Sequence, residues 1–224
     1  SRSAIRKRMA GRVRELKQIG GLLAEANNRT GRILVLSGPA GIGKTRIMDE
    51  VRRRLLAGGL EILWCEVSCM GISKNRPFAA AADLLDRLAD AATLDLTEVE
   101  QRAAEALRTK RTAPLDAADT LRLTLVHAVT GLCARGLTVL FVDNLCFIDD
   151  ASLGLLHHLA HAIEHLPVLL ALSIRSGYIH GFEESRISTS IETGPLSAAE
   201  MSQLVSTELE AEPPAGLLDR LQSI

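Results

Sequence analysis

The sequence predicts an α/β protein with three layers, in which helices cover both faces of a mostly parallel, five-stranded sheet. Apolar runs of strand length alternate along the chain with stretches of helical periodicity. Strands that alternate with helices imply right-handed crossovers and parallel pairing. A chain of 224 residues, 47% of them apolar, is also long enough to bury one sizeable core.

The first predicted elements are a helix, a strand and a second helix. Residues 11–28 space their apolar side chains along one helix face, and "RILVLSG" (32–38) is a continuous apolar run. Such a run is typical of a strand that is buried on both faces. The segment "TRIMDEVRRRLLAGG" (45–59) returns to helical spacing and stops at two glycines. A glycine-rich turn therefore joins the first strand to the second helix.

The alternation continues toward the end of the chain. Further strands are predicted at 61–67, 136–144, 167–175 and around 187–194, with helices at about 152–166 and 197–209. A long helical stretch lies between the second and third strands, divided by breaks near Thr93 and Pro114. The sequence contains neither an internal repeat nor a low-complexity tract.

Composition narrows the class of protein. The net charge of −1 gives no basic excess for gripping nucleic acid, and we interpret the basic run from Arg2 to Lys17 as a solvated helix face. No stretch approaches the roughly 18 to 20 apolar residues of a membrane span, and the N-terminus lacks an apolar signal region. We expect a cytoplasmic protein. Its four cysteines lack metal-site or disulfide spacing and are expected to be reduced thiols: Cys65, Cys69, Cys133 and Cys146.

The glycine-rich turn carries the strongest functional signal. Its eight residues satisfy GxxxxGK[ST], with a buried strand before and a helix after, as a P-loop requires. Glycines let successive N–H groups surround phosphate oxygens, and the helix adds its positive dipole end. Lys44 would reach the β- and γ-phosphates, and the Thr45 hydroxyl would ligate Mg²⁺. We predict a P-loop nucleotide-binding fold, in which the nucleotide is held by Gly38, Pro39, Ala40, Gly41, Ile42, Gly43, Lys44, Thr45 and Arg46.

An acidic residue that ends the third strand is the second part of the predicted site. The segment "TVLFVDN" places Asp143 at the carboxyl end of a buried strand, where ligands sit in open α/β sheets. We expect this strand to lie beside the P-loop strand and to supply a carboxylate to Mg²⁺. The alternative is a plain helix cap.

Asn144 follows Asp143, at a position where many P-loop ATPases carry a second acid that activates the attacking water. An amide can orient a water molecule, but it does not accept a proton, and a positioned general base is worth about 10² to 10⁴ in rate. We therefore expect tight nucleotide binding with slow hydrolysis. Asp149 and Asp150 are substitutes if their loop folds back, although we favour an ordinary helix start there.

Five segments then follow one another in a recognisable order: "GRVRELKQI", "SGPAGIGKTRIMDEV", "VLFVDNLCFIDDASLGLLHHLA", "PVLLALSIRS" and "GPLSAAEMSQLV". Together they resemble the N-terminal ATPase domain of the large ATP-binding regulators of the LuxR family. That family belongs to the signal-transducing P-loop ATPases with numerous domains (STAND), relatives of the AAA+ class. The resemblance covers almost the whole chain, and its specific features are "DASL" after the acidic strand and the late "GPLSxxE".

The resemblance implies roles for individual residues. It matches residues 38–45 to the Walker A segment, Asp143 to the Walker B aspartate and Arg175 to a polar sensor position. Arg175 is alternatively a salt-bridged arginine at a strand end. Residues 143–149 read DNLCFID where family members commonly read DDLHWAD, a departure that concerns hydrolysis more than binding. The predicted catalytic set is Lys44, Asp143, Asn144 and Arg175. The resemblance also implies that the nucleotide is ATP or ADP, bound with Mg²⁺.

The resemblance also implies a longer parent protein. In the family, the ATPase domain continues into a helical lid, a winged-helix element, helical repeats and a DNA-binding helix-turn-helix. We expect residues 1–30 to be a helical lead-in, 31–195 the P-loop core and 196–224 the start of a truncated lid. DNA would be contacted only through a domain absent from this chain. A homo-oligomer formed through the ATPase domain is a second partner hypothesis.

The sequence leaves alternatives open for the role of three histidines and for the function of the protein. His157, His161 and His165 follow i, i+4, i+8 spacing and would either bind a metal or, as we favour, lie on the solvated side of a helix. The protein would act as an ATP-hydrolysing switch or as a nucleotide-sensing scaffold without meaningful turnover. A small-molecule kinase is less favoured, because no acceptor site or lid is identifiable.

Overall fold

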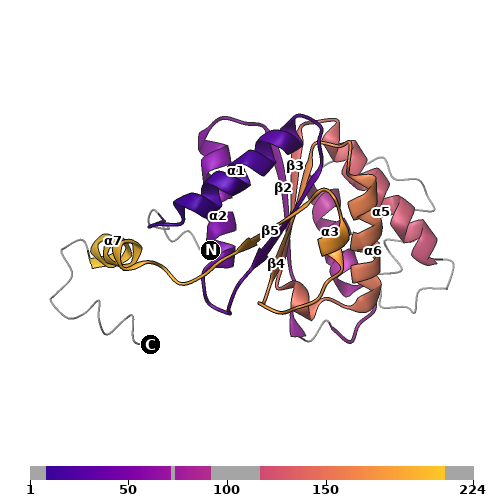
Figure 1. Cartoon of the computed structure of the whole chain (residues 1–224). Helices are drawn as coiled ribbons and strands as arrows, with labels where there is room; N and C mark the ends of the chain where they lie inside the picture. The colour runs from indigo at the N-terminus through magenta and orange to yellow at the C-terminus, as the bar shows by residue number, and fades with distance from the viewer. Residues whose placement is uncertain (1–8, 72–73, 92–116, 210–224) are drawn as a thin grey trace.

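The computed structural model describes residues 9–71, 74–91 and 117–209. Five strands in these ranges form one parallel sheet in the order β2-β3-β4-β1-β5 (Figure 1). The strands are β1 (Arg32–Ser37), β2 (Ile62–Ser68), β3 (Leu137–Asp143), β4 (Val168–Ile174) and β5 (Ser188–Glu192). The predicted α/β class with a parallel sheet is confirmed.

Helices cover the sheet from both sides, which completes the predicted three layers (Figure 1). On one side lie α1 (Val13–Asn27) and α2 (Lys44–Ala57), and on the other lie α3 (Ala79–Ala91), α5 (Ala117–Cys133) and α6 (Asp150–Ala162). The last described helix, α7 (Ala198–Leu209), projects away from the sheet. No helix in the described ranges is long and apolar enough to cross a membrane.

Some sequence predictions fall on other parts of the chain. The breaks near Thr93 and Pro114, the first residues of the basic run and the chain after residue 209 lie outside the described residues. The domain boundaries at 30 and 195 stay a prediction. Within the described part of the basic run, Arg14 and Lys17 are exposed, but Arg12 is buried. The interpretation of the whole run as a solvated face is therefore wrong at Arg12.

The core explains why the strand sequences are continuous apolar runs. Alternate residues of β1 point to opposite faces: Ile33 and Val35 pack with α3, α5 and α6, whereas Leu34 and Leu36 pack with α1 and α2. Every residue of β3 and β4 is buried. Because the central strands β3 and β4 are covered on both faces, each of their positions favours an apolar side chain, and a polar residue there needs a specific partner. The edge strands β2 and β5 are only partly buried.

The expected strand order is wrong in one respect. The strand that ends at Asp143 is not beside the P-loop strand, because β4 lies between them and pairs with both. Chain order does not determine strand order, and here the last two crossovers place β4 and β5 on either side of β1. The consequence is that the carboxyl end of β4 contributes directly to the site between the P-loop and Asp143.

Candidate functional site

The loop between β1 and α2 requires glycine at two positions for different reasons. Gly43 is the N-cap of α2 and has a φ of 102°, a conformation that residues with a Cβ rarely adopt. At Gly38, an added Cβ would lie 2.6 Å from the carbonyl oxygen of Thr193. The loop thus passes close to the end of β5, and the first residues of α2 line a cleft. The start of a helix favours anions there, because of its backbone N–H groups and its dipole.

The cleft has a volume of about 460 Å³ and lies where β1, β3 and β4 reach their carboxyl ends. This is the edge at which ligands bind in open α/β sheets. Most of the predicted site residues line it, together with Asp49, which the sequence analysis did not include. The lining consists of Ala40, Gly41, Gly43, Lys44, Thr45, Arg46, Asp49, Asp143, Asn144 and Arg175.

Lys44 is largely buried at the start of α2, and its ammonium group is held by the loop itself. Nζ donates hydrogen bonds of 2.8 Å to the carbonyl oxygens of Gly38 and Pro39. Burial is the main cause that lowers the pKa of Lys44, Asp143 acts in the opposite direction, and Arg175 lowers the pKa further. An ammonium has three N–H donors, so the two loop carbonyls leave one for an anion in the cleft.

Thr45, at the start of α2, contacts Asp143, at the carboxyl end of β3, although 98 residues separate them in the chain. The Thr45 hydroxyl donates a 2.9 Å hydrogen bond to Oδ2 of Asp143. A hydroxyl and a carboxylate side by side form an oxygen donor pair of the kind that binds Mg²⁺ jointly with water and phosphate oxygens. The residues present therefore fit Mg²⁺. The two predicted metal ligands lie together, and their binding of the ion stays a prediction.

Ser173 orients the other carboxylate oxygen of Asp143 and was missed by the sequence analysis. This fully buried residue of β4 donates a hydrogen bond to Oδ1 of Asp143. The backbone N–H of Asn144 donates to both of them, at 2.9 Å to Ser173 Oγ and 3.0 Å to Asp143 Oδ1. The available signal was a lone hydroxyl inside the apolar run "PVLLALSIR", because a buried hydroxyl needs a partner.

Asn144 begins the short 3₁₀ helix η2 (Leu145–Phe147) and lines the cleft beside Asp143. Its φ of 56° and ψ of 47° are left-handed, a conformation that asparagine and aspartate tolerate better than most residues. The hydrogen bonds to Ser173 and Asp143 come from the backbone N–H of Asn144. A substitution at this position therefore changes the side chain and leaves these bonds available.

Arg175 follows β4 at the cleft and is exposed to solvent. Its guanidinium carbon lies 5.1 Å from the centre of the Phe147 ring, a cation–π arrangement. Within the described part of the chain, no ion pair joins Arg175 to a carboxylate, so the salt-bridged alternative has no support. Lys44, Arg46 and Arg175 are the cationic residues that line the cleft, and their roles toward a ligand stay a prediction.

Asp149 is not placed to serve as a base in this cleft. It is buried and is the N-cap of α6, where Oδ1 accepts 2.8 Å and 2.7 Å hydrogen bonds from the N–H groups of Ser152 and Phe78. The N–H of Ala80 is 3.4 Å from Oδ2. The favoured interpretation of a helix start is thus correct, with Asp149 as the cap and Asp150 in the first turn. Because of this cap, α6 begins two residues before the expected start.

Replacing Asp149 by alanine should cost about 2 to 4 kcal/mol of unfolding free energy, because a helix cap is lost and buried N–H groups lose their acceptor. Urea denaturation followed by circular dichroism measures this. Asp150→Ala is the matched control, since its carboxylate is exposed in the first helical turn and is worth less than about 1 kcal/mol. Equal losses for the two variants would contradict the assignment of Asp149 as the cap of α6 that also accepts hydrogen bonds from Phe78 and Ala80.

The histidines and cysteines do not gather into a site. His161 and His165 are exposed, α6 ends before His165, and half-buried His157 stacks on Phe182 at 4.1 Å, so the solvated interpretation is wrong for His157. All four thiols are free, and burial raises the pKa of Cys65 to about 11 and of Cys69 to about 12. Among the described residues, no group of three His, Cys, Asp or Glu is arranged to hold a metal ion.

Comparison with known families agrees with this geometry. The model of the AAA ATPase domain family matches residues 8–171, and the chain belongs to that family. An uncharacterised protein from Rhizobium meliloti (strain 1021) is 27% identical over 214 residues, a match that spans 86% of this chain and 21% of that protein. The chain thus spans about a fifth of the length of this curated relative.

Solved structures with the same fold include proteins named ORC and Cdc6. The Aeropyrum pernix ORC1 protein in complex with DNA matches with a TM-score of 0.61 and 20% identity, over 96% of this chain and 53% of that one. Cdc6p from Pyrobaculum aerophilum matches with a TM-score of 0.63 and 16% identity, over 96% and 54%. At these identities the similarity establishes the fold alone, and this chain spans about half of each structure.

Proposed function

We propose that this AAA ATPase domain is a nucleotide-dependent switch that binds Mg²⁺ with ATP or ADP in the cleft and hydrolyses ATP slowly. The observation that carries the proposal is the convergence of Lys44, Thr45 and Asp143 on one cleft at the start of α2. The Lys44 ammonium would bind phosphate oxygens, and the Thr45 hydroxyl and the Asp143 carboxylate would bind the Mg²⁺ ion of a magnesium-bound triphosphate.

Each residue has a role that follows from its surroundings. The N–H groups at the start of α2 and the free donor of Lys44 would bind the β- and γ-phosphates, with Arg175 contributing a further positive charge. Thr45 and Asp143 would hold Mg²⁺, which when bound neutralises charge on the phosphates. Ser173 keeps the Asp143 carboxylate aligned with Thr45.

Slow hydrolysis is inferred from Asn144. Its amide lies beside Asp143 at the cleft and can orient a water molecule, but it cannot take the proton of that water. Asp149, the nearest buried carboxylate downstream, already accepts three backbone N–H groups in a different part of the fold. The second candidate function, a nucleotide-sensing scaffold without turnover, is favoured by the same residue.

The setting proposed for this switch is a larger cytoplasmic transcriptional regulator of the LuxR type. The sequence resemblance and the short span of this chain within its curated relative support it. In that setting, DNA would be contacted through another domain of the parent protein, and the ATPase domain would assemble with further copies. The ORC1 structure that shares the fold is described as a complex with DNA, which is a property of that protein.

Isothermal titration calorimetry with ATP and ADP in the presence of Mg²⁺, together with phosphate release from the same samples, tests the proposal. Binding of both nucleotides with slow release of phosphate is the expected result. Binding without release above background would favour the scaffold, and rapid turnover would contradict the role assigned to Asn144. Absence of binding would overturn the nucleotide site.

A further inference from the structure

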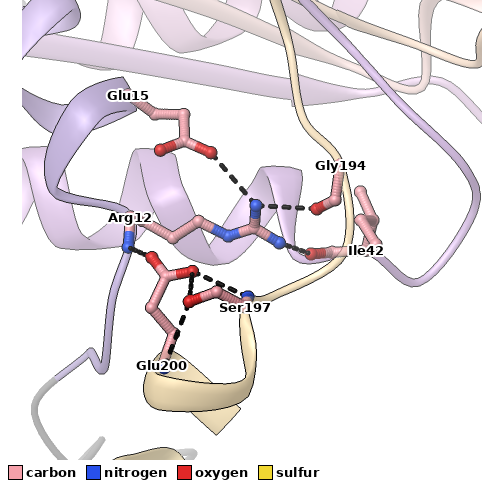
Figure 2. A network of polar contacts seen from close by, with 6 residues as sticks. All are labelled: Arg12, Glu15, Ile42, Gly194, Ser197 and Glu200. Atoms are coloured by element: carbon pink, nitrogen blue, oxygen red, sulfur yellow. Dashed lines mark hydrogen bonds and ion pairs between the residues drawn. The ribbon is translucent and has the colours of Figure 1, made fainter. Parts of the chain in front are cut away.

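Arg12 is a buried arginine at the entrance to α1 that joins three segments of the chain. Figure 2 shows its guanidinium between the P-loop, α1 and the connection from β5 to α7. Nη1 donates a 2.7 Å hydrogen bond to the carbonyl oxygen of Gly194 and contacts Glu15 Oε1 at 3.0 Å, while Nη2 lies 3.2 Å from the carbonyl oxygen of Ile42. Only 4% of the residue is exposed.

The backbone of Arg12 makes a second connection, to α7. Its N–H donates a 2.8 Å hydrogen bond to Oε1 of Glu200, whose other oxygen accepts from the backbone and the hydroxyl of Ser197 at 2.9 Å and 2.8 Å (Figure 2). Ser197 and Glu200 form the capping box that starts α7. The pKa of Glu200 is lowered most by the hydrogen bond from the Ser197 backbone, then by that from the Arg12 backbone and then by that from the Ser197 hydroxyl. The residue that caps α7 therefore also attaches it to Arg12.

Glu200 lies so close to Gly11 that it restricts which residue fits at position 11. Gly11 has a φ of 69°, and a Cβ added there would lie 2.6 Å from Oε1 of Glu200. A side chain at this position would be strained and would push Glu200 away from Arg12. Gly11 thus offers a way to disturb the attachment of α7 without changing a polar group of the network.

The same network reaches the nucleotide cleft through the loop backbone. Ile42 lies between Gly41 and Gly43, both of which line the cleft, so a hydrogen bond to its carbonyl fixes the local direction of the loop amides. On the other side, the N–H of Thr193 donates a 2.8 Å hydrogen bond to the carbonyl oxygen of Ser37, directly before the loop. The P-loop is consequently held between the end of β5 and the Arg12 guanidinium.

We propose that Arg12 is a positioning residue that couples nucleotide binding at the P-loop to the docking of α7. One planar guanidinium serves the loop carbonyl and the Gly194 carbonyl together, so an arrangement that favours one contact favours the other. Coupling of this kind is reciprocal: nucleotide stabilises docked α7, and docked α7 strengthens nucleotide binding. The inference rests on the proposed nucleotide site and specifies how occupancy of that site would be transmitted.

Hydrogen–deuterium exchange of α7 in the whole chain tests the coupling, with calorimetry on the same samples to establish binding of Mg²⁺–ATP. Saturating nucleotide should slow exchange in peptides that cover residues 197–209 by about 5-fold or more. In Arg12→Lys, whose ammonium cannot span both carbonyls, the slowing should disappear and the affinity should fall by a similar factor. Arg14→Lys, an exposed neighbour on α1, is the matched control and should behave as wild type.

Gly11→Ala keeps the experiment decisive if Arg12→Lys fails to fold, because it retains the guanidinium. It should remove most of the nucleotide-dependent slowing in α7 while the P-loop peptide remains protected by nucleotide. Wild-type protein that binds nucleotide with no change in α7 exchange would overturn the coupling and leave the nucleotide site intact. Absence of binding by calorimetry would overturn both. A uniform loss of stability in the variants, with the α7 response retained, would reduce Arg12 to a structural role.

Discussion

Replacement of Lys44 by alanine should weaken binding of Mg²⁺–ATP by at least about 30-fold, since charge-assisted hydrogen bonds contribute roughly 1.5 to 3 kcal/mol each. Lys44 is the buried cation of the loop, and its ammonium stands between the loop carbonyls and the cleft. Removing it takes away a donor and a positive charge where the β- and γ-phosphates would lie. Calorimetric titration of both proteins with Mg²⁺–ATP and Mg²⁺–ADP gives the two affinities.

Two further variants separate charge from packing. Lys44→Met keeps an unbranched side chain of similar length but lacks the ammonium, so it should lose binding as Lys44→Ala does. Lys17→Ala removes an exposed lysine from α1 and should leave the affinity unchanged. If both Lys44 variants bound nucleotide with wild-type affinity, the assignment of this loop to phosphate binding would be wrong.

The strands and most helices were predictable because their sequence patterns are local. The central strands β3 and β4 are covered on both faces, so they are continuous apolar runs that stand out from the amphipathic helices. The P-loop was predictable for the same reason, since its glycines, lysine and threonine are adjacent in sequence and their geometry follows from strand, turn and helix.

The strand order was not predictable from these patterns. Parallel strands joined by helical crossovers form several orders with the same local sequences, and the apolar runs of β1, β3 and β4 indicate burial but not which of these strands are neighbours. In the structure β4 pairs with both β1 and β3. That pairing places Ser173 next to Asp143, a contact between residues 30 positions apart.

Arg12 illustrates a second limit of prediction from the sequence, which concerns contacts between residues far apart in the chain. Among basic neighbours its sequence environment resembles that of a solvated helix face, yet its partners Ile42, Gly194 and Glu200 lie 30 to 188 residues away. Two of them use backbone carbonyl oxygens, which every residue possesses and which leave no mark in the sequence. Asp149 is a milder case, because its position before a helix indicated the cap of α6 but not its bonds to the start of α3.

Replacement of Asn144 by aspartate should raise the rate of ATP hydrolysis by about 10² to 10⁴ if a missing general base limits turnover. The substitution suits the site because aspartate also tolerates the left-handed backbone at this position. The backbone N–H that binds Ser173 and Asp143 is unchanged, so the orientation of Asp143 is preserved. Phosphate release under saturating Mg²⁺–ATP measures the effect, and calorimetry confirms that binding is retained.

Asn144→Ser is the matched control, because it removes the amide without supplying a carboxylate. It should hydrolyse ATP no faster than wild type, and more slowly if the amide orients the attacking water. A rise in both variants would mean that the amide itself obstructs the reaction. A flat response in Asn144→Asp, with nucleotide bound, would show that turnover is limited by a group outside this cleft, such as one from a lid or a second subunit. The slow rate would then no longer be a consequence of residue 144, which is the step on which the proposed switch depends.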